Sequence, residues 1–158
     1  MRRRKSYFTT PEGMPAPLAV TVRRRTAFSE VDAMAVAWHG NYLRFFEAAH
    51  TELMQKIGLG FAVYAKYDLA APVVQSHVDY FAPLMLDEEF TVRAELFWND
   101  GARLDIAYTV TGADGTLRAT GFTVQMFWGL KSREVFIFPP EVRDRRGTED
   151  VCAGSLHV

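Results

Sequence analysis

Apolar residues recur at two different periods along the chain, which predicts a helix in one part and a sheet in the other. Between Asn41 and Gly58 the spacing is helical. Glycine commonly ends a helix because it adopts the left-handed conformation without strain, so Gly58 is the predicted stop. The pattern predicts one long, mostly buried helix. Its solvent-facing residues are expected to be Arg44, Glu52, Gln55 and Lys56.

Alternation at period two predicts one strand before this helix and four antiparallel strands after it. The predicted strands cover 18–28, 73–81, 89–98, 102–111 and 116–130. Asn99-Asp100-Gly101 is a strong hairpin signal between two of them. Segment 61–69 is compatible with a helical extension or with a covering loop.

This order of elements predicts an α+β domain in which a curved antiparallel sheet of about five strands wraps one long central helix. The domain is expected to cover residues 18–140, and 158 residues suffice to bury its core. Residues 1–17 combine an arginine cluster with prolines and Gly13, which predicts a flexible basic arm. Residues 141–158 are expected to form a short helical turn and a polar tail.

Composition excludes several classes of protein. A net charge of −1 and a pI near 6.4 argue against a general nucleic-acid binder. The lone Cys152 forms no internal disulfide, which fits a reducing cytoplasm. No apolar run approaches the roughly 20 residues of a membrane-spanning helix, and the N-terminus lacks the apolar segment of a signal peptide. Zinc-type spacing and glycine-rich phosphate loops are missing, so neither a metal nor a cofactor is expected.

Candidate chemistry gathers just before the helix. Asp32 precedes the small apolar run 33–37, and His39 follows seven residues after Asp32. Free amide groups and the positive end of the helix dipole collect at a helix N-terminus, where they can bind an anion or a developing oxyanion. Simpler interpretations exist. Asp32 could be a loop aspartate that bonds nearby amides, and His39 could be structural.

The spacing Phe28-x-x-x-Asp32, six residues, His39-x-Asn41-Tyr42 resembles hotdog-fold acyl-CoA thioesterases of the 4-hydroxybenzoyl-CoA thioesterase type. Segments 45–49 and 78–84 extend the resemblance, which spans roughly residues 20–140.

That resemblance implies roles for individual residues. Asp32 would act on the thioester carbonyl as nucleophile or as general base for water. A backbone amide near His39 would polarise the carbonyl oxygen, and the His39 side chain would orient the aspartate, bind water or bond the thioester. Asn41 and Tyr42 are expected to bind substrate.

Two positions depart from the family pattern. Ala35 stands where many members have glycine, which is expected to alter the loop, and Phe28 stands where many have tyrosine. Glu47 is interpreted as a buried hydrogen-bond anchor, while His50 and His77 are interpreted as structural.

The implied function is hydrolysis of an acyl thioester of coenzyme A or of an acyl carrier protein. The alternative is a non-hydrolytic hotdog domain that binds acyl chains or acts as a dehydratase. Phosphates of coenzyme A would be bound by arginines. The candidates are Arg44, Arg93, Arg103 and Arg133.

A homodimer or homotetramer is expected, because the last predicted strand carries more apolar residues than one face of one subunit needs. These residues are Phe122, Val124, Met126 and Trp128, with Phe127 opposite.

Overall fold

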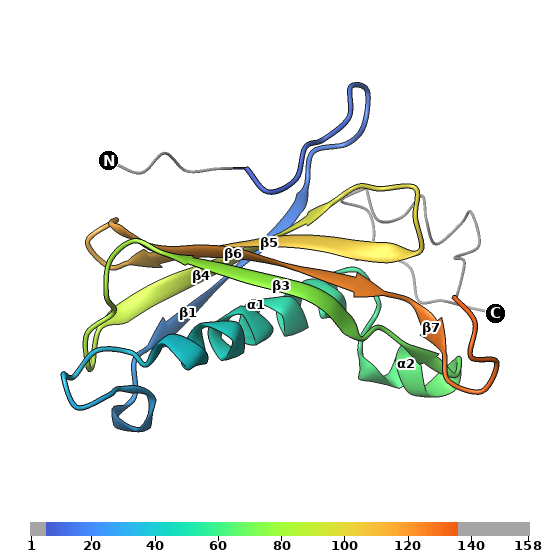
Figure 1. Cartoon of the computed structure of the whole chain (residues 1–158). Helices are drawn as coiled ribbons and strands as arrows, with labels where there is room; N and C mark the ends of the chain where they lie inside the picture. The colour runs from blue at the N-terminus through green and yellow to red at the C-terminus, as the bar shows by residue number, and fades with distance from the viewer. Residues whose placement is uncertain (1–5, 136–158) are drawn as a thin grey trace.

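The computed structural model describes residues 6–135, which form one antiparallel sheet with a long helix across one face (Figure 1). In spatial order the sheet consists of β1 (Leu18–Arg25), β4 (Glu89–Phe97), β5 (Arg103–Gly112), β6 (Leu117–Met126) and β3 (Val73–Tyr80). The helix is α1 (Tyr42–Lys56). The shorter elements are the 3-10 helices η1 (Phe28–Glu30) and η2 (His39–Asn41), the helix α2 (Phe61–Lys66) and the strand pair β2 (Leu69–Ala70) and β7 (Trp128–Gly129). The predicted α+β architecture is confirmed.

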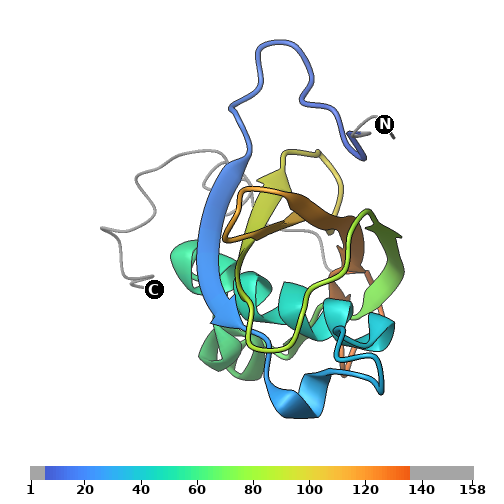
Figure 2. The same cartoon turned by 90° about the vertical axis from the view of Figure 1, so that its left-hand side faces the viewer.

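The core lies between α1 and the concave face of the sheet (Figure 2). Period-two alternation places alternate residues of β4 and β5 on this face, where they are buried. Phe46 of α1 stacks on Tyr108 of β5, with ring centroids 4.5 Å apart and an interplanar angle of 2°. Phe45 packs against Phe90 of β4 at 5.0 Å. The buried strand residues are Phe90, Val92, Ala94, Leu96, Leu104, Ile106, Tyr108 and Val110.

The prediction of a mostly buried helix is wrong for one face of α1. The sheet covers a single side of the helix, so the opposite side reaches solvent. Glu52 and Gln55 are exposed as expected, whereas Lys56 is half-buried and donates to the backbone oxygen of Ala19 at 3.3 Å. The buried residues of α1 are Tyr42, Phe45, Phe46, Ala49, Leu53 and Met54.

The predicted last strand, 116–130, is divided in two. β6 ends at Met126, and the N–H of the buried Phe127 donates to the oxygen of Ala102 at 3.0 Å. Trp128 then starts β7, which pairs with β2 away from the main sheet. Segment 61–69, which the pattern left open, contains α2 and the start of β2.

The N-terminal segment lies on the face of the sheet opposite α1 (Figure 1). Residues 6–17 contain no helix or strand. Even so, the Tyr7 hydroxyl donates to Asp79 at 2.8 Å, and the Phe8 ring lies 5.5 Å from the rings of Phe97 and Phe122. This part of the predicted arm is therefore attached to the sheet. Residues 1–5, Pro139-Pro140 and the predicted tail 141–158 lie outside the described residues.

Candidate active site

Asp32 begins a tight turn between η1 and η2. Its N–H donates to Val36 O at 2.9 Å, and the Ala35 N–H donates to Asp32 O at 3.0 Å. The carboxylate is half-buried, and its Oδ1 accepts the Met34 N–H at 2.8 Å. Val31 and Ala37 are bridged on either side of the turn. The chain between Val31 and Ala37 is therefore a small hairpin, and Asp32 occupies the first position of its turn.

Ala35 adopts the left-handed conformation, with φ of 58°. For a residue with a Cβ this conformation costs on the order of 1–2 kcal/mol. Alanine thus keeps a backbone shape that favours glycine, the residue that many relatives of the resembled family carry here. The Ala35 oxygen accepts the Leu86 N–H at 2.9 Å, which helps to fix this conformation.

Segment 84–88 holds the hairpin from the side of the sheet. The Ala37 N–H donates to Leu84 O at 2.8 Å, and Val36 bridges Met85. Glu88 in turn fixes this segment, because its Oε2 accepts the Met85 N–H at 2.8 Å and its Oε1 accepts Arg118 Nη2 at 2.7 Å.

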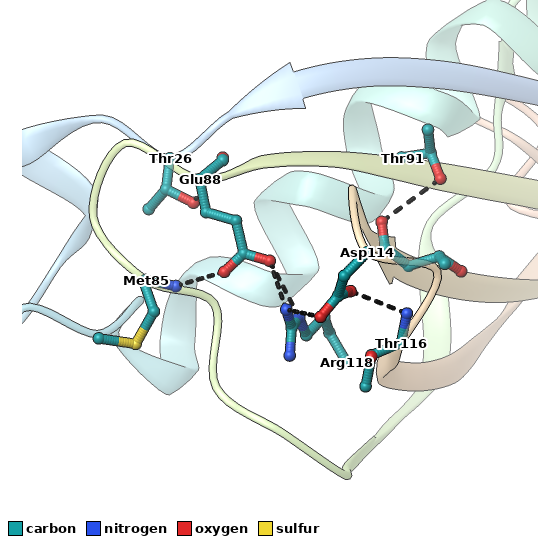
Figure 3. Close-up of polar contacts among 8 residues, drawn as sticks. Thr26, Met85, Glu88, Thr91, Asp114, Thr116 and Arg118 are labelled. Carbon is teal, nitrogen blue, oxygen red and sulfur yellow. Dashed lines mark hydrogen bonds and ion pairs between the residues drawn. The ribbon is translucent and has the colours of Figure 1, made fainter.

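Figure 3 shows the resulting chain of polar contacts, which continues from Arg118 to Asp114 at 3.0 Å. Neither Glu88 nor Arg118 was predicted from the sequence, since the two residues that pair here are 30 positions apart in the chain.

Glu30 connects the hairpin to the start of α1. Its backbone oxygen accepts the Trp38 N–H at 2.9 Å and the Asn41 Nδ2 at 2.8 Å. Its buried carboxylate accepts the Ala27 N–H at 2.9 Å and pairs with Arg24 at 2.9 Å. Sequence analysis also missed this residue. The available signal was a glutamate three residues after Ala27, the spacing of a helix capping box.

The start of the helix offers unbonded backbone donors. η2 leads directly into α1, and within residues 6–135 the amides of His39 and Gly40 have no hydrogen-bond acceptor. A Cβ at position 40 would collide with the Trp38 ring, so only glycine fits beneath this indole. The backbone N–H groups of residues 39 and 40 therefore form a free donor pair at the positive end of α1.

The His39 side chain is exposed, and its ring lies 5.0 Å from that of Trp38. Its backbone oxygen accepts the Tyr80 hydroxyl at 2.9 Å. In the described part of the chain the imidazole makes no hydrogen bond to Asp32. The structure therefore places Asp32 on the hairpin and His39 in the 3-10 helix that follows it, without joining the two side chains.

Asn41 and Tyr42 are both buried. Asn41 bonds Glu30, as described above, and the Tyr42 ring packs edge-on against Tyr80 at 5.0 Å. Burial raises the pKa of Tyr42. Both side chains thus fix the start of the helix, and their substrate-binding roles stay predictions.

Glu47 is exposed, so the expectation of a buried anchor is wrong; the side of α1 that carries it is not covered by the sheet. His50 bonds Gln125 at 2.9 Å, and His77 lies 3.1 Å from Asp79.

Among the four candidate arginines, Arg93 pairs with Glu95 at 3.2 Å and Arg103 with Asp105 at 2.9 Å. Arg44 is exposed in the first turn of α1, and Arg133 is exposed near the end of the described chain.

A long helix against a curved antiparallel sheet defines a hotdog domain, and Asp32 lies on the hairpin before the helix start. The family model described as the Thioesterase-like superfamily matches residues 26–145, so the chain belongs to this superfamily.

The chain is 32% identical over 74 residues to a putative esterase of Aquifex aeolicus, covering 47% of this chain and 58% of that relative. It is 27% identical over 93 residues to the acyl-CoA thioester hydrolase YbgC of Escherichia coli, covering 59% and 69% of the two chains.

A solved DHNA-CoA thioesterase from Staphylococcus aureus superposes with a TM-score of 0.73 at 22% identity, covering 80% of this chain and 87% of that one. This likeness confirms the hotdog fold. Across residues 6–135, no helix has the length and apolar character needed to cross a membrane. The same residues contain no group of three or more His, Cys, Asp or Glu side chains able to hold a metal ion.

Proposed function

We propose that the chain hydrolyses an acyl thioester of coenzyme A to a carboxylic acid and a free thiol. The observation that carries this proposal is that Asp32 lies on the hairpin 31–37 and that the unbonded amides of His39 and Gly40 follow this hairpin at the start of α1. Family membership and the acyl-CoA activity named for YbgC support it. An acyl carrier protein thioester is a second substrate of the same chemistry.

In this proposal the thioester oxygen accepts hydrogen bonds from the His39 and Gly40 amides, which stabilise the negative charge that develops on it. The Asp32 carboxylate acts on the carbonyl carbon in one of two ways. It attacks the carbon directly, forming an anhydride that water then cleaves, or it takes a proton from the attacking water. In both cases the C–S bond breaks, the thiolate leaves and is protonated, and water supplies the new carboxyl oxygen.

The imidazole of His39 is exposed beside this site, where it can bind the attacking water or the thioester. Asn41 contributes by holding the donor pair against Glu30, and Tyr42 by packing the helix start. Direct contact of Asn41 or Tyr42 with substrate is a separate proposal, and it requires these buried side chains to become accessible.

Arg44 is the candidate for binding the phosphates of coenzyme A that lies nearest to the helix start. Its guanidinium is exposed, and its one described hydrogen bond is a long contact of 3.5 Å to Asn41. Arg93 and Arg103, by contrast, are paired with carboxylates. If Arg44 binds phosphate, high salt should lower activity on acyl-CoA more than on a short uncharged thioester. Equal salt effects on the two substrates would refute phosphate binding by Arg44.

A homodimer is proposed on the basis of the edge strand β3. It pairs with β6 on one side only, and residues 73–77 are exposed, including Val73 at 52% and Val74 at 55%. An exposed apolar edge favours pairing with another strand. Light scattering at micromolar concentration should give at least twice the chain mass of 17.9 kDa, and a monomer mass would refute this assembly.

The alternative function is a non-hydrolytic or dehydratase-like hotdog domain. A dehydratase would pair its acid with a histidine across subunits, and His39 is a candidate for that role, but the spacing from Asp32 to Asn41 and Tyr42 resembles the thioesterases more closely. Mixing the protein with a panel of acyl-CoAs and a thiol reagent separates these functions. Release of free thiol supports hydrolysis, whereas binding without release supports the alternative.

A further inference from the structure

A cavity of about 380 Å³ lies between α1 and the strands β3, β5 and β6. Its helix wall is formed by Leu43, Phe46, Glu47 and His50, which follow one another from the first turn of α1 towards its middle. Because a helix rises 1.5 Å per residue, His50 lies about 12 Å along the axis from Tyr42. The cavity therefore extends along α1 away from the proposed thioester site.

Polar groups gather in this cavity around His50. The sheet supplies Ser76, Thr123 and Gln125, where the core positions of β4 and β5 are apolar. Register explains the placement: Thr123 lies opposite Ile106, and Gln125 lies opposite Leu104, so both point to the side of the sheet that faces the helix.

Gln125 has hydrogen-bonding capacity to spare. Its Oε1 lies 2.9 Å from His50 Nε2, which donates to it. The Thr123 hydroxyl is bonded to the Tyr108 hydroxyl at 3.1 Å. Within residues 6–135 the Gln125 amide N–H groups have no acceptor, although Gln125 is only 8% exposed. The amide nitrogen is not among the fully buried atoms that lack a partner in residues 6–135, so it is accessible, and its two N–H groups are suited to an oxygen atom of a molecule bound in the cavity.

The charge of the cavity wall limits what this molecule can be. No lysine or arginine lines the cavity, and Glu47 adds a carboxylate. Burial lowers the pKa of His50, so its imidazole is neutral near pH 7. A carboxylate on the ligand would meet the charge of Glu47 without a compensating cation. A hydroxyl or carbonyl oxygen would accept from Gln125 without this repulsion.

We propose that this cavity holds the far end of the acyl group, and that the His50–Gln125 pair selects acyl groups that carry a neutral hydroxyl or carbonyl there. The inference rests on the proposed function, because the proposed function places the thioester at the start of α1. Leu43 and Phe46 then contact the apolar middle of the acyl group, and Gln125 donates to its distal oxygen.

The test measures kcat/KM for matched pairs of substrates: octanoyl-CoA with its ω-hydroxy and ω-carboxy derivatives, and naphthoyl-CoA with a hydroxynaphthoyl-CoA. The two sets distinguish aliphatic from aromatic acyl groups. The wild type should prefer a hydroxylated substrate over its parent by about fivefold, the value of one ordinary hydrogen bond. The ω-carboxy derivative should be the poorest of its set.

Gln125→Leu keeps a similar volume and removes the donor, so it should abolish the hydroxyl preference, measured as the ratio of kcat/KM for each hydroxylated substrate to that for its parent. His50→Phe keeps Gln125 but removes the hydrogen bond that orients its amide, so it should weaken the hydroxyl preference, and it replaces Gln125→Leu if that variant does not fold. Gln55→Leu makes the same exchange at an exposed position of α1 outside the cavity, and should keep the preference.

A wild-type ratio near one, or a ratio that survives in Gln125→Leu, would overturn the inference and leave the proposed function standing. If the wild type hydrolyses none of these thioesters, the proposed function fails and this inference fails with it.

Discussion

Asn41→Ala tests whether Asn41 holds the site together or binds substrate. The side chain is 6% exposed, and its Nδ2 donates to Glu30 O at 2.8 Å. It makes no capping bond to α1, so alanine loses no capping energy. Glu30 O still receives the Trp38 N–H at 2.9 Å, so no buried acceptor is orphaned. The loss is then one ordinary hydrogen bond, about 1 kcal/mol of unfolding free energy.

For a chain of this length, about 1 kcal/mol corresponds to a fall in Tm of roughly 2–4 °C. We also expect kcat for acyl-CoA hydrolysis to fall while KM changes little, because the donor pair and the Asp32 hairpin are less firmly joined. Circular dichroism melts and steady-state kinetics measure these two effects.

Asn41→Asp is the matched control, since it keeps the shape but sets an acceptor against Glu30 O and should destabilise at least as much as alanine. Unchanged stability with a strongly raised KM would refute the positioning role and favour direct substrate binding.

Two further predictions concern stability and pH. In Gly121→Ala the new Cβ would collide with the His77 backbone oxygen and the Phe46 ring, so the free energy of unfolding should fall by about 1–3 kcal/mol. Urea unfolding measures this loss, and Thr51→Ala at an exposed position is the neutral control. Burial lowers the pKa of His50 below its ordinary 6.5, so the unfolded chain binds this proton more readily than the folded chain. The wild type therefore keeps its full stability above pH 6.5 and loses part of it as the pH falls from 6.5 towards the lower pKa of His50 in the folded chain. His50→Gln lacks this titrating group, so it should lose less stability than the wild type between about pH 7.5 and about pH 5.5. An equal loss in both proteins would contradict this assignment.

Periodicity predicted the main helix and the five strands of the sheet because each depends on local spacing of apolar residues. The predicted stop is met: α1 ends at Lys56, and Gly58 adopts a positive φ of 71°. Periodicity failed at the buried Phe127, whose backbone N–H bonds the oxygen of Ala102 and which separates β6 from β7. It also failed for the exposed side of α1, because apolar spacing does not reveal how many faces a sheet covers.

The site was predicted in part. Asp32, His39 and the helix start follow from residue type and spacing, but the groups that hold them are distant in the sequence. Glu88 depends on Arg118, and segment 84–88 reaches the hairpin only through the folded sheet. The contact of Tyr7 with Asp79 is likewise a long-range event that composition could not indicate.

The central claim is that Asp32 supplies the charge that drives thioester hydrolysis. Asp32→Asn keeps the size of the side chain and an oxygen for the Met34 N–H, so the hairpin and the fold should survive. It removes the basicity and the ionised nucleophile.

The deciding measurement is the rate of thiol release from acyl-CoA by wild type, Asp32→Asn, His39→Ala and the control Glu47→Gln. We predict a fall of at least about a hundredfold in Asp32→Asn, a smaller fall in His39→Ala because its backbone amide remains, and only a small change in Glu47→Gln, which lines the acyl cavity away from the thioester. A folded Asp32→Asn variant that binds acyl-CoA and hydrolyses it at nearly the wild-type rate would contradict the proposed function of this site.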